Sequence, residues 1–188
     1  GGVLSQQGRG LEAHFSDAEM KSIADTAHSL GLQVMAHAHG ARGVEAASRA
    51  GIDTIEHGTY LDEAAANEMK KNGTVLIPTL MAFQGVTERL GKGIYTPVVE
   101  EKIRAVAETA RVFMGKAMRW GVPIAFGTDA GVFGHGRNAG EFALMVAQGM
   151  GHREAFATAT TNAAKVLGME KVFRPEFDFP GSWFNIGQ

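Results

Sequence analysis

The sequence predicts an α/β protein in which parallel strands alternate with helices. Three observations lead to this fold class. Helical segments alternate with short, largely apolar segments, a glycine follows each helical segment, and polar side chains stand where the apolar segments end. Continuously apolar strands are typical of a parallel sheet, because the helices on its crossover connections bury both faces.

The first helix and strand are defined by a cap and a glycine. Ser16 and Glu19 form a capping-box pattern, which predicts a helix from that point to about Leu30. Gly31 is placed to end the helix, and residues 32–36 then form a short apolar segment. We therefore expect a helix followed by a buried strand.

The same order recurs three more times along the chain. Further helices are expected over residues 41–50, 62–71 and 97–120. Further strands are expected over residues 52–56, 74–77 and 122–126. A polar, glycine-rich stretch over residues 84–96 is expected to be a loop.

A polar side chain that could carry chemistry follows each predicted strand. These residues are His37, His57, Thr79 and Asp129. In a β/α barrel the C-terminal ends of the strands carry the active site, and a full eight-stranded barrel typically takes about 250 residues. Four β/α units therefore indicate about half of a TIM-type (β/α)8 barrel, with a site at one mouth of the sheet.

The composition excludes several classes of function. Among 188 residues, 18 Lys and Arg stand against 20 Asp and Glu, and this net charge of −2 indicates no nucleic-acid or membrane-surface partner. There is no cysteine, so any metal must be held by histidine, carboxylate or water. The apolar runs fall short of the roughly 20 residues of a membrane span. We expect a soluble domain, with a cytoplasmic location favoured.

His37, His57 and Asp129 are the candidate metal ligands. They follow three separate strands, and parallel packing would bring their side chains to one mouth of the sheet. Imidazole and carboxylate form the ligand set of zinc and similar divalent ions. Taken singly, each histidine could be structural and Asp129 could cap the following helix. One metal site explains all three positions, so we favour it.

The candidate substrate-binding residues surround that site. His39 lies two residues beyond His37 and shares its face only if the strand continues that far. His135, Arg137 and Asn138 lie in the loop after Asp129, at the end of the barrel where loops contact substrate. A solvated turn explains this loop equally well.

Four motifs stand in order along the chain: Val34-Met35-Ala36-His37-Ala38-His39-Gly40, Thr54-Ile55-Glu56-His57-Gly58-Thr59, Phe126-Gly127-Thr128-Asp129-Ala130-Gly131 and the run at residues 159–168. Together they resemble the amidohydrolase superfamily, in particular its imidazolonepropionase-like and Xaa-Pro dipeptidase-like branch. The resemblance implies that His37 and His57 are the metal ligands of barrel strands five and six. It also implies that Asp129 is the strand-eight carboxylate that binds metal and shuttles a proton. The implied activity is hydrolysis of amide or peptide-like bonds by water on a divalent metal, most often zinc.

The resemblance covers residues 1–170, as strands five to eight of a barrel, and it has departures. The family's His-x-His pair of strand one and bridging lysine of strand four are missing. Residues 171–188 form an aromatic-rich tail instead of the family's small β-domain. Unpaired sheet edges lead us to expect a homo-oligomer. Two alternatives stay open: a non-catalytic interaction module, and an ester or lactone hydrolase with a single metal. The expected partner is a small-molecule amide, dipeptide or ester.

Overall fold

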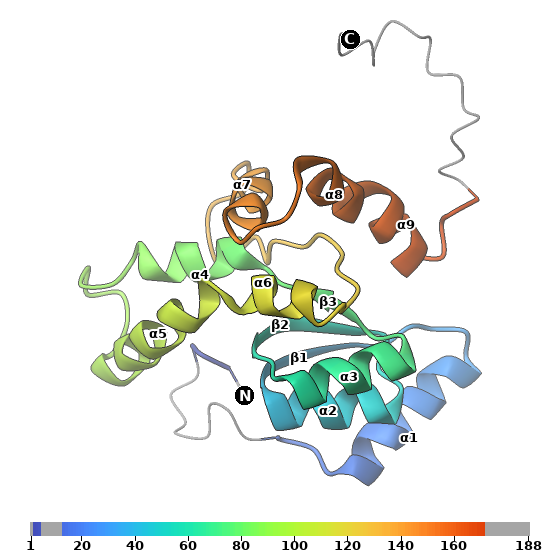
Figure 1. Cartoon of the computed structure of the whole chain (residues 1–188). Coiled ribbons are helices and arrows are strands. Elements are labelled where there is room, and N and C mark those ends of the chain that lie inside the picture. The colour runs from blue at the N-terminus through green and yellow to red at the C-terminus, as the bar shows by residue number, and fades with distance from the viewer. Residues whose placement is uncertain (1, 5–12, 172–188) are drawn as a thin grey trace, which may run out of the picture.

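The computed structural model describes residues 2–4 and 13–171, and its centre is a parallel three-stranded sheet with helices around it (Figure 1). In the order β1-β2-β3, the strands are β1 Met35–Gly40, β2 Thr54–Tyr60 and β3 Val75–Ile77. The helices are α1 Asp17–Ser29, α2 Ala41–Ala50, α3 Glu63–Asn72, α4 Leu80–Thr87, α5 Pro97–Ala110, α6 Phe113–Arg119, α7 Gly140–Ala147, α8 His152–Ala157, the π-helix η1 Thr158–Asn162 and α9 Ala163–Val166. The predicted α/β class with a parallel sheet is confirmed.

The predicted fourth strand is present only as a single parallel bridge. Ile124 pairs with Leu76 of β3, and the Leu76 N–H donates to the Pro123 carbonyl at 2.9 Å. Beyond that point the backbone bonds elsewhere: the Phe126 N–H donates to the Thr158 carbonyl at 3.0 Å, and the Asn162 side chain donates to the Ile124 carbonyl at 2.9 Å. The π-helix η1 thus takes the backbone groups that a longer ladder would use.

Three predicted boundaries need correction, and the first concerns the long helix over residues 97–120. It is two helices, α5 and α6, because the backbone leaves the helical region at Val112, where φ is −136°. The Gln148 side chain forms hydrogen bonds with the end of α5 and the start of α6. Its amide nitrogen donates to the Ala110 carbonyl at 2.8 Å, and its oxygen accepts from the Met114 N–H at 3.1 Å.

The other two corrections concern the strand ends and the expected loop. The strands β1 and β2 run on to Gly40 and Tyr60, so that His37, His39 and His57 lie within the sheet. The stretch expected to be a loop begins inside α4. Its glycine at position 85 misled the prediction: a Cβ there would lie 2.7 Å from Cβ of Phe133, so this glycine serves close packing within a helix.

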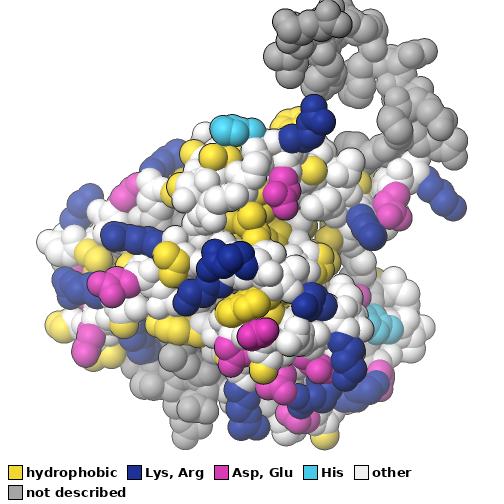
Figure 2. All heavy atoms as spheres, viewed as in Figure 1, with side chains coloured by type: hydrophobic (Ala, Val, Ile, Leu, Met, Phe, Trp, Pro, Cys, Tyr) yellow, Lys and Arg dark blue, Asp and Glu magenta, His cyan; other side chains and the backbone are white. Residues whose placement is uncertain are grey.

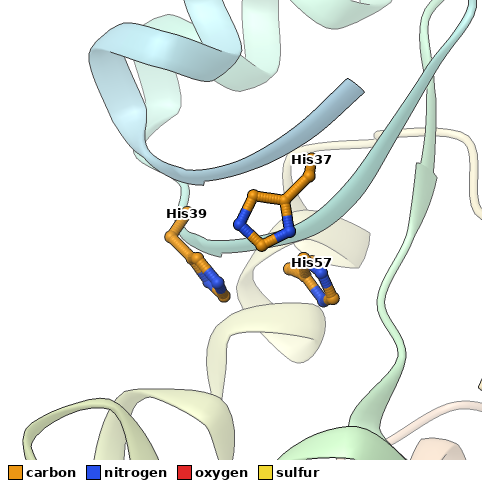
Figure 3. Close-up of side chains that lie close together, drawn as sticks. All are labelled: His37, His39 and His57. Atoms are coloured by element: carbon orange, nitrogen blue, oxygen red, sulfur yellow. The ribbon is translucent and has the colours of Figure 1, made fainter. Parts of the chain in front are cut away.

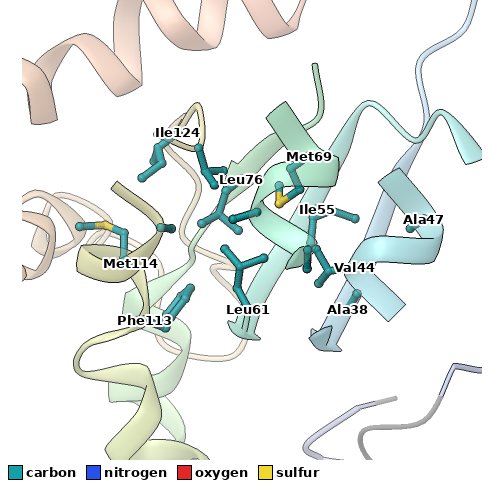
Figure 4. Packing of buried hydrophobic residues seen from close by; sticks show 14 of the residues in the cluster. Ala38, Val44, Ala47, Ile55, Leu61, Met69, Leu76, Phe113, Met114 and Ile124 are labelled. Carbon is teal, nitrogen blue, oxygen red and sulfur yellow. The ribbon is translucent and has the colours of Figure 1, made fainter. Parts of the chain in front are cut away.

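The core forms between the sheet and the helices that cover it (Figure 4). Ile55 of β2 and Leu76 of β3 are fully buried and pack with Val44, Met69 and Phe113 from three helices. Fully burying a side chain of this size stabilises a fold by about 1.5–3 kcal/mol. This packing fixes β2, which pairs with β1, and those two strands carry the histidines.

One face of the molecule carries charged side chains of both signs (Figure 2). Lysine and arginine side chains alternate with acidic side chains over the face seen in Figure 2. Among the helices that the structure describes, none is long and apolar enough to span a bilayer.

Within the sheet, β1 is an edge strand, and Met35 at its start is 68% exposed. The expected self-association stays a prediction, and the predicted tail lies outside the described residues beyond position 171.

Candidate metal centre

Three histidines converge at the C-terminal ends of β1 and β2 (Figure 3). His37 and His39 lie on the same side of β1 because the strand continues through both, which settles the question that the sequence left open. His57 comes from β2, where it stands opposite Ala38 in the register. The ring centroids lie 4.5 Å apart for His37 and His57, 4.7 Å for His37 and His39, and 4.8 Å for His39 and His57.

Each of the two buried rings is fixed by a threonine hydroxyl. Nδ1 of His39 lies 2.9 Å from Oγ1 of Thr59, and Nδ1 of His57 lies 2.6 Å from Oγ1 of Thr79. Because the hydroxyl occupies Nδ1, Nε2 is the ring nitrogen that stays available to a metal ion. One ring nitrogen from each of the three histidines lies within 4.8 Å of the others, a grouping that could hold a metal ion.

The two buried imidazoles are neutral. Burial lowers the pKa of His39 to about 2, and the neighbouring His57 and His37 lower it further. Burial likewise lowers the pKa of His57 to about 3, with His37 as the second cause. Neutral imidazole has a free lone pair and is the form that binds metal. The donor set is therefore suited to a divalent ion.

These shifts predict that the metal-free protein loses stability in acid. The unfolded chain protonates its histidines below a pKa of about 6.5, while the folded state resists protonation, so stability is complete above pH 6.5 and falls below it. For each buried histidine, the unfolding free energy should fall by about 1.4 kcal/mol for every pH unit below the unfolded-state pKa. Urea unfolding between pH 7 and pH 5 measures the slope. A His39→Gln, His57→Gln double variant with the same slope would contradict the prediction.

Asp129 lies on the wall of the same cavity as the three histidines. This cavity of about 500 Å³ is also lined by Glu56 and Thr79. Burial raises the pKa of the Asp129 carboxyl, and the nearby His37 opposes that rise. Burial also raises the pKa of Glu56, with the charge of Asp129 as a smaller cause in the same direction. Two carboxyl groups and three imidazoles thus share one pocket.

Strained backbone is concentrated at this cavity. In the described part of the chain, the non-glycine residues with positive φ are His57 at 77°, Thr79 at 50° and Asp129 at 54°. Such conformations cost of order 1–3 kcal/mol each and persist only where the surroundings impose them. At His57 the turn breaks the alternation of β2, which explains why Glu56 and His57 line the same cavity although neighbours in a regular strand point apart.

The predicted loop residues lie outside this group. Arg137 forms a two-pronged ion pair with Glu88, next to the end of α4, with both nitrogen–oxygen distances at 2.8 Å. His135 and Asn138 are exposed. The loop reaches the cavity through Val132. Substrate binding by His135, Arg137 and Asn138 stays a prediction, as does the division of roles among His37, His39, His57 and Asp129.

Comparison with known proteins identifies the family. The profile of the Amidohydrolase family matches residues 2–172. The chain belongs to this family. A solved Xaa-Pro dipeptidase structure with bound methionine superposes on this amidohydrolase chain with a TM-score of 0.87 and 39% identity, over 91% of this chain and 42% of that one.

Curated relatives agree with this assignment. Ochratoxinase of Aspergillus niger is 33% identical over 89% of this chain and 35% of its own length. An imidazolonepropionase of Shewanella oneidensis is 28% identical over 83% of this chain and 35% of its own length. The amidohydrolase chain thus spans less than half of the length of these relatives. The resemblance drawn from the motifs, including its branch and its partial extent, is confirmed.

Sequence reasoning missed Thr59 and Glu56, and it placed Thr79 at a strand end without giving it a role. Thr59 and Thr79 hold the rings of His39 and His57, and Glu56 lines the cavity. The position of Thr79 near the end of an apolar strand was a usable signal, because His57 and Asp129 occupy the same kind of position. Thr59 gave no such signal, since it lies beyond the predicted strand end at residue 56. Glu56 is the last residue of that predicted strand, and regular alternation would point it away from His57.

Proposed function

We propose that this amidohydrolase chain carries the metal-binding part of an active site that hydrolyses amide or peptide-like bonds. The observation that supports it best is the group of three histidines, two of them buried and neutral, on the same cavity wall as Asp129. The proposed ligands are His37, His57 and Asp129, and His39 offers a third imidazole within the same group. A divalent metal such as zinc, when bound, would lower the pKa of a water and polarise the substrate carbonyl.

In this proposal Asp129 moves the proton. Desolvation raises the pKa of its carboxyl, which strengthens it as a base for the attacking water and then as an acid toward the leaving amine. The left-handed backbone at Asp129 turns this side chain into the cavity beside His37. His39 and His57 keep their neutral form at neutral pH, so neither competes for that proton.

The cavity favours a small substrate. Its volume of about 500 Å³ is typical of pockets for small molecules, and its walls include the apolar side chains of Val86, Phe83 and Val132. The relatives include a structure described as an Xaa-Pro dipeptidase and an enzyme named ochratoxinase. A dipeptide or another small amide with an apolar group is therefore the proposed substrate class.

A hydrolysis assay under controlled metal supply tests the proposal. We expect turnover of some members of a panel of Xaa-Pro dipeptides and N-acyl amino acids, loss of turnover with a chelator, and recovery with added zinc, manganese or cobalt. A His37→Ala, His57→Ala variant prepared identically controls for contaminating hydrolases. If the chain hydrolyses esters but no amides, the proposed amide hydrolysis is wrong and the chain is an ester hydrolase. Inactivity with every metal would favour the interaction module.

A further inference from the structure

Glu141 is a buried carboxylate outside the cavity that none of the proposed steps uses. Its side chain is 0% exposed and lies on α7, yet it bonds the first turn of α4. One oxygen accepts from the Leu80 N–H at 2.8 Å and the other accepts from the Met81 N–H at 2.7 Å. The two helices approach closely here, because a Cβ at Gly140 would lie 2.7 Å from the Met81 sulfur.

The position of Glu141 matters because α4 lacks its own cap. The residue before α4 is Thr79, and a threonine there normally accepts a hydrogen bond from an N–H of the first turn. Thr79 makes no such bond. Its hydroxyl instead donates to the Pro78 carbonyl at 2.8 Å and lies 2.6 Å from Nδ1 of His57.

The bonding of Thr79 favours one tautomer of His57. A hydroxyl has one hydrogen, and that of Thr79 is directed to Pro78, so toward His57 its oxygen is an acceptor. In this arrangement Nδ1 of His57 carries the proton, and the lone pair stands on Nε2. A neutral ring with this tautomer binds metal through Nε2.

We propose that Glu141 is a positioning residue for His57: by capping α4 in place of Thr79, it frees the Thr79 hydroxyl to hold His57 as the Nδ1–H tautomer. Without that cap, the Leu80 and Met81 N–H groups would lose their acceptor, and the Met81 N–H, the second of α4, would compete for the Thr79 oxygen. Thr79 has a left-handed backbone conformation, and without Glu141 the first turn of α4 that follows it would no longer be capped. The metal-binding consequence rests on the proposed function, whereas the tautomer does not.

The tautomer can be measured in the metal-free chain labelled with ¹⁵N-histidine. Burial raises the pKa of Glu141 to about 7, against the opposing bonds from Met81 and Leu80, so spectra are recorded at about pH 8.5, where the carboxyl is ionised. We expect the long-range ¹H–¹⁵N pattern of an Nδ1–H ring for His57 in the wild type. In Glu141→Gln we expect a mixture of tautomers and zinc affinity at least tenfold weaker by competition with a chelator.

A matched control separates positioning from general loss of a helix cap. Ser16→Ala removes the capping side chain of α1, which bonds within residues 16–19, and should leave the His57 pattern and the zinc affinity unchanged. An Nε2–H pattern in the wild type would overturn the inference, as would a folded Glu141→Gln with unchanged spectra and affinity. If Glu141→Gln fails to fold, Glu141→Asp keeps the charge but shortens the reach, and unchanged His57 signals there would also overturn it.

The proposed function and this inference can fail separately. A wild-type chain that shows the Nδ1–H pattern and its loss in Glu141→Gln, but binds no zinc, supports the role of Glu141 and counts against the metal site. A chain that binds zinc equally well with and without Glu141 keeps the proposed function and removes the positioning role.

Discussion

Protein purified without added metal or chelator should contain about one equivalent of a divalent transition metal, because two or three imidazoles and a carboxylate make a complete ligand set for one ion. The ligand nitrogens of His37, His39 and His57 lie within 4.8 Å of one another before any ion is bound. His39 and His57 need no deprotonation to bind at neutral pH, since burial already keeps them neutral. Elemental analysis by mass spectrometry measures the content directly.

Single variants show which histidines hold the ion. We expect His37→Ala and His57→Ala each to lower the metal content to near zero. His39→Ala decides between two roles: loss of metal would make His39 a ligand, and retained metal would leave it facing the substrate. His152→Ala, on α8, is the matched control because that side chain lies outside the cluster. Metal-free wild-type protein that takes up no zinc on titration would contradict the prediction.

The site was predictable from the sequence to the extent that it depends on strand order. Parallel strands present their C-terminal ends at one edge, so the positions of His37, His57 and Asp129 after apolar segments were enough to place them on the wall of one cavity. Residue spacing could not show that β1 continues through His39. That depends on the pairing of β1 with β2, whose partners lie about twenty residues away in the chain.

The least predictable parts of the fold depend on single long-range side-chain contacts. The break between α5 and α6 is bonded by Gln148, which lies 38 residues beyond Ala110. The cap of α4 comes from Glu141, which lies 61 residues beyond Leu80. The helical periodicity of residues 97–120 does not indicate the contact between Gln148 and Ala110. A glutamate in the first turn of a helix is ordinarily a surface residue, so the sequence gives no sign of the contact between Glu141 and Leu80.

Replacing Asp129 by asparagine should lower the hydrolytic rate by about 10²–10⁴-fold, the usual contribution of a positioned proton-transfer group. Asparagine is nearly the same size and adopts the left-handed backbone as readily as aspartate, so the strained turn at φ 54° should persist. The measurement is the turnover number on whichever substrate the assay identifies. Circular dichroism melting of the same preparation checks that the fold is retained.

The two functions assigned to Asp129 make different predictions for this variant. If the carboxylate serves only as a ligand, excess metal should restore turnover, because His37 and His57 would still bind the ion at higher concentration. If it moves the proton, turnover stays low at saturating metal, since asparagine has no group that titrates in the working range. The raised pKa of Asp129 and its place beside His37 favour proton transfer. Unchanged turnover at limiting metal would exclude both roles and turn attention to Glu56, the other carboxyl in the cavity.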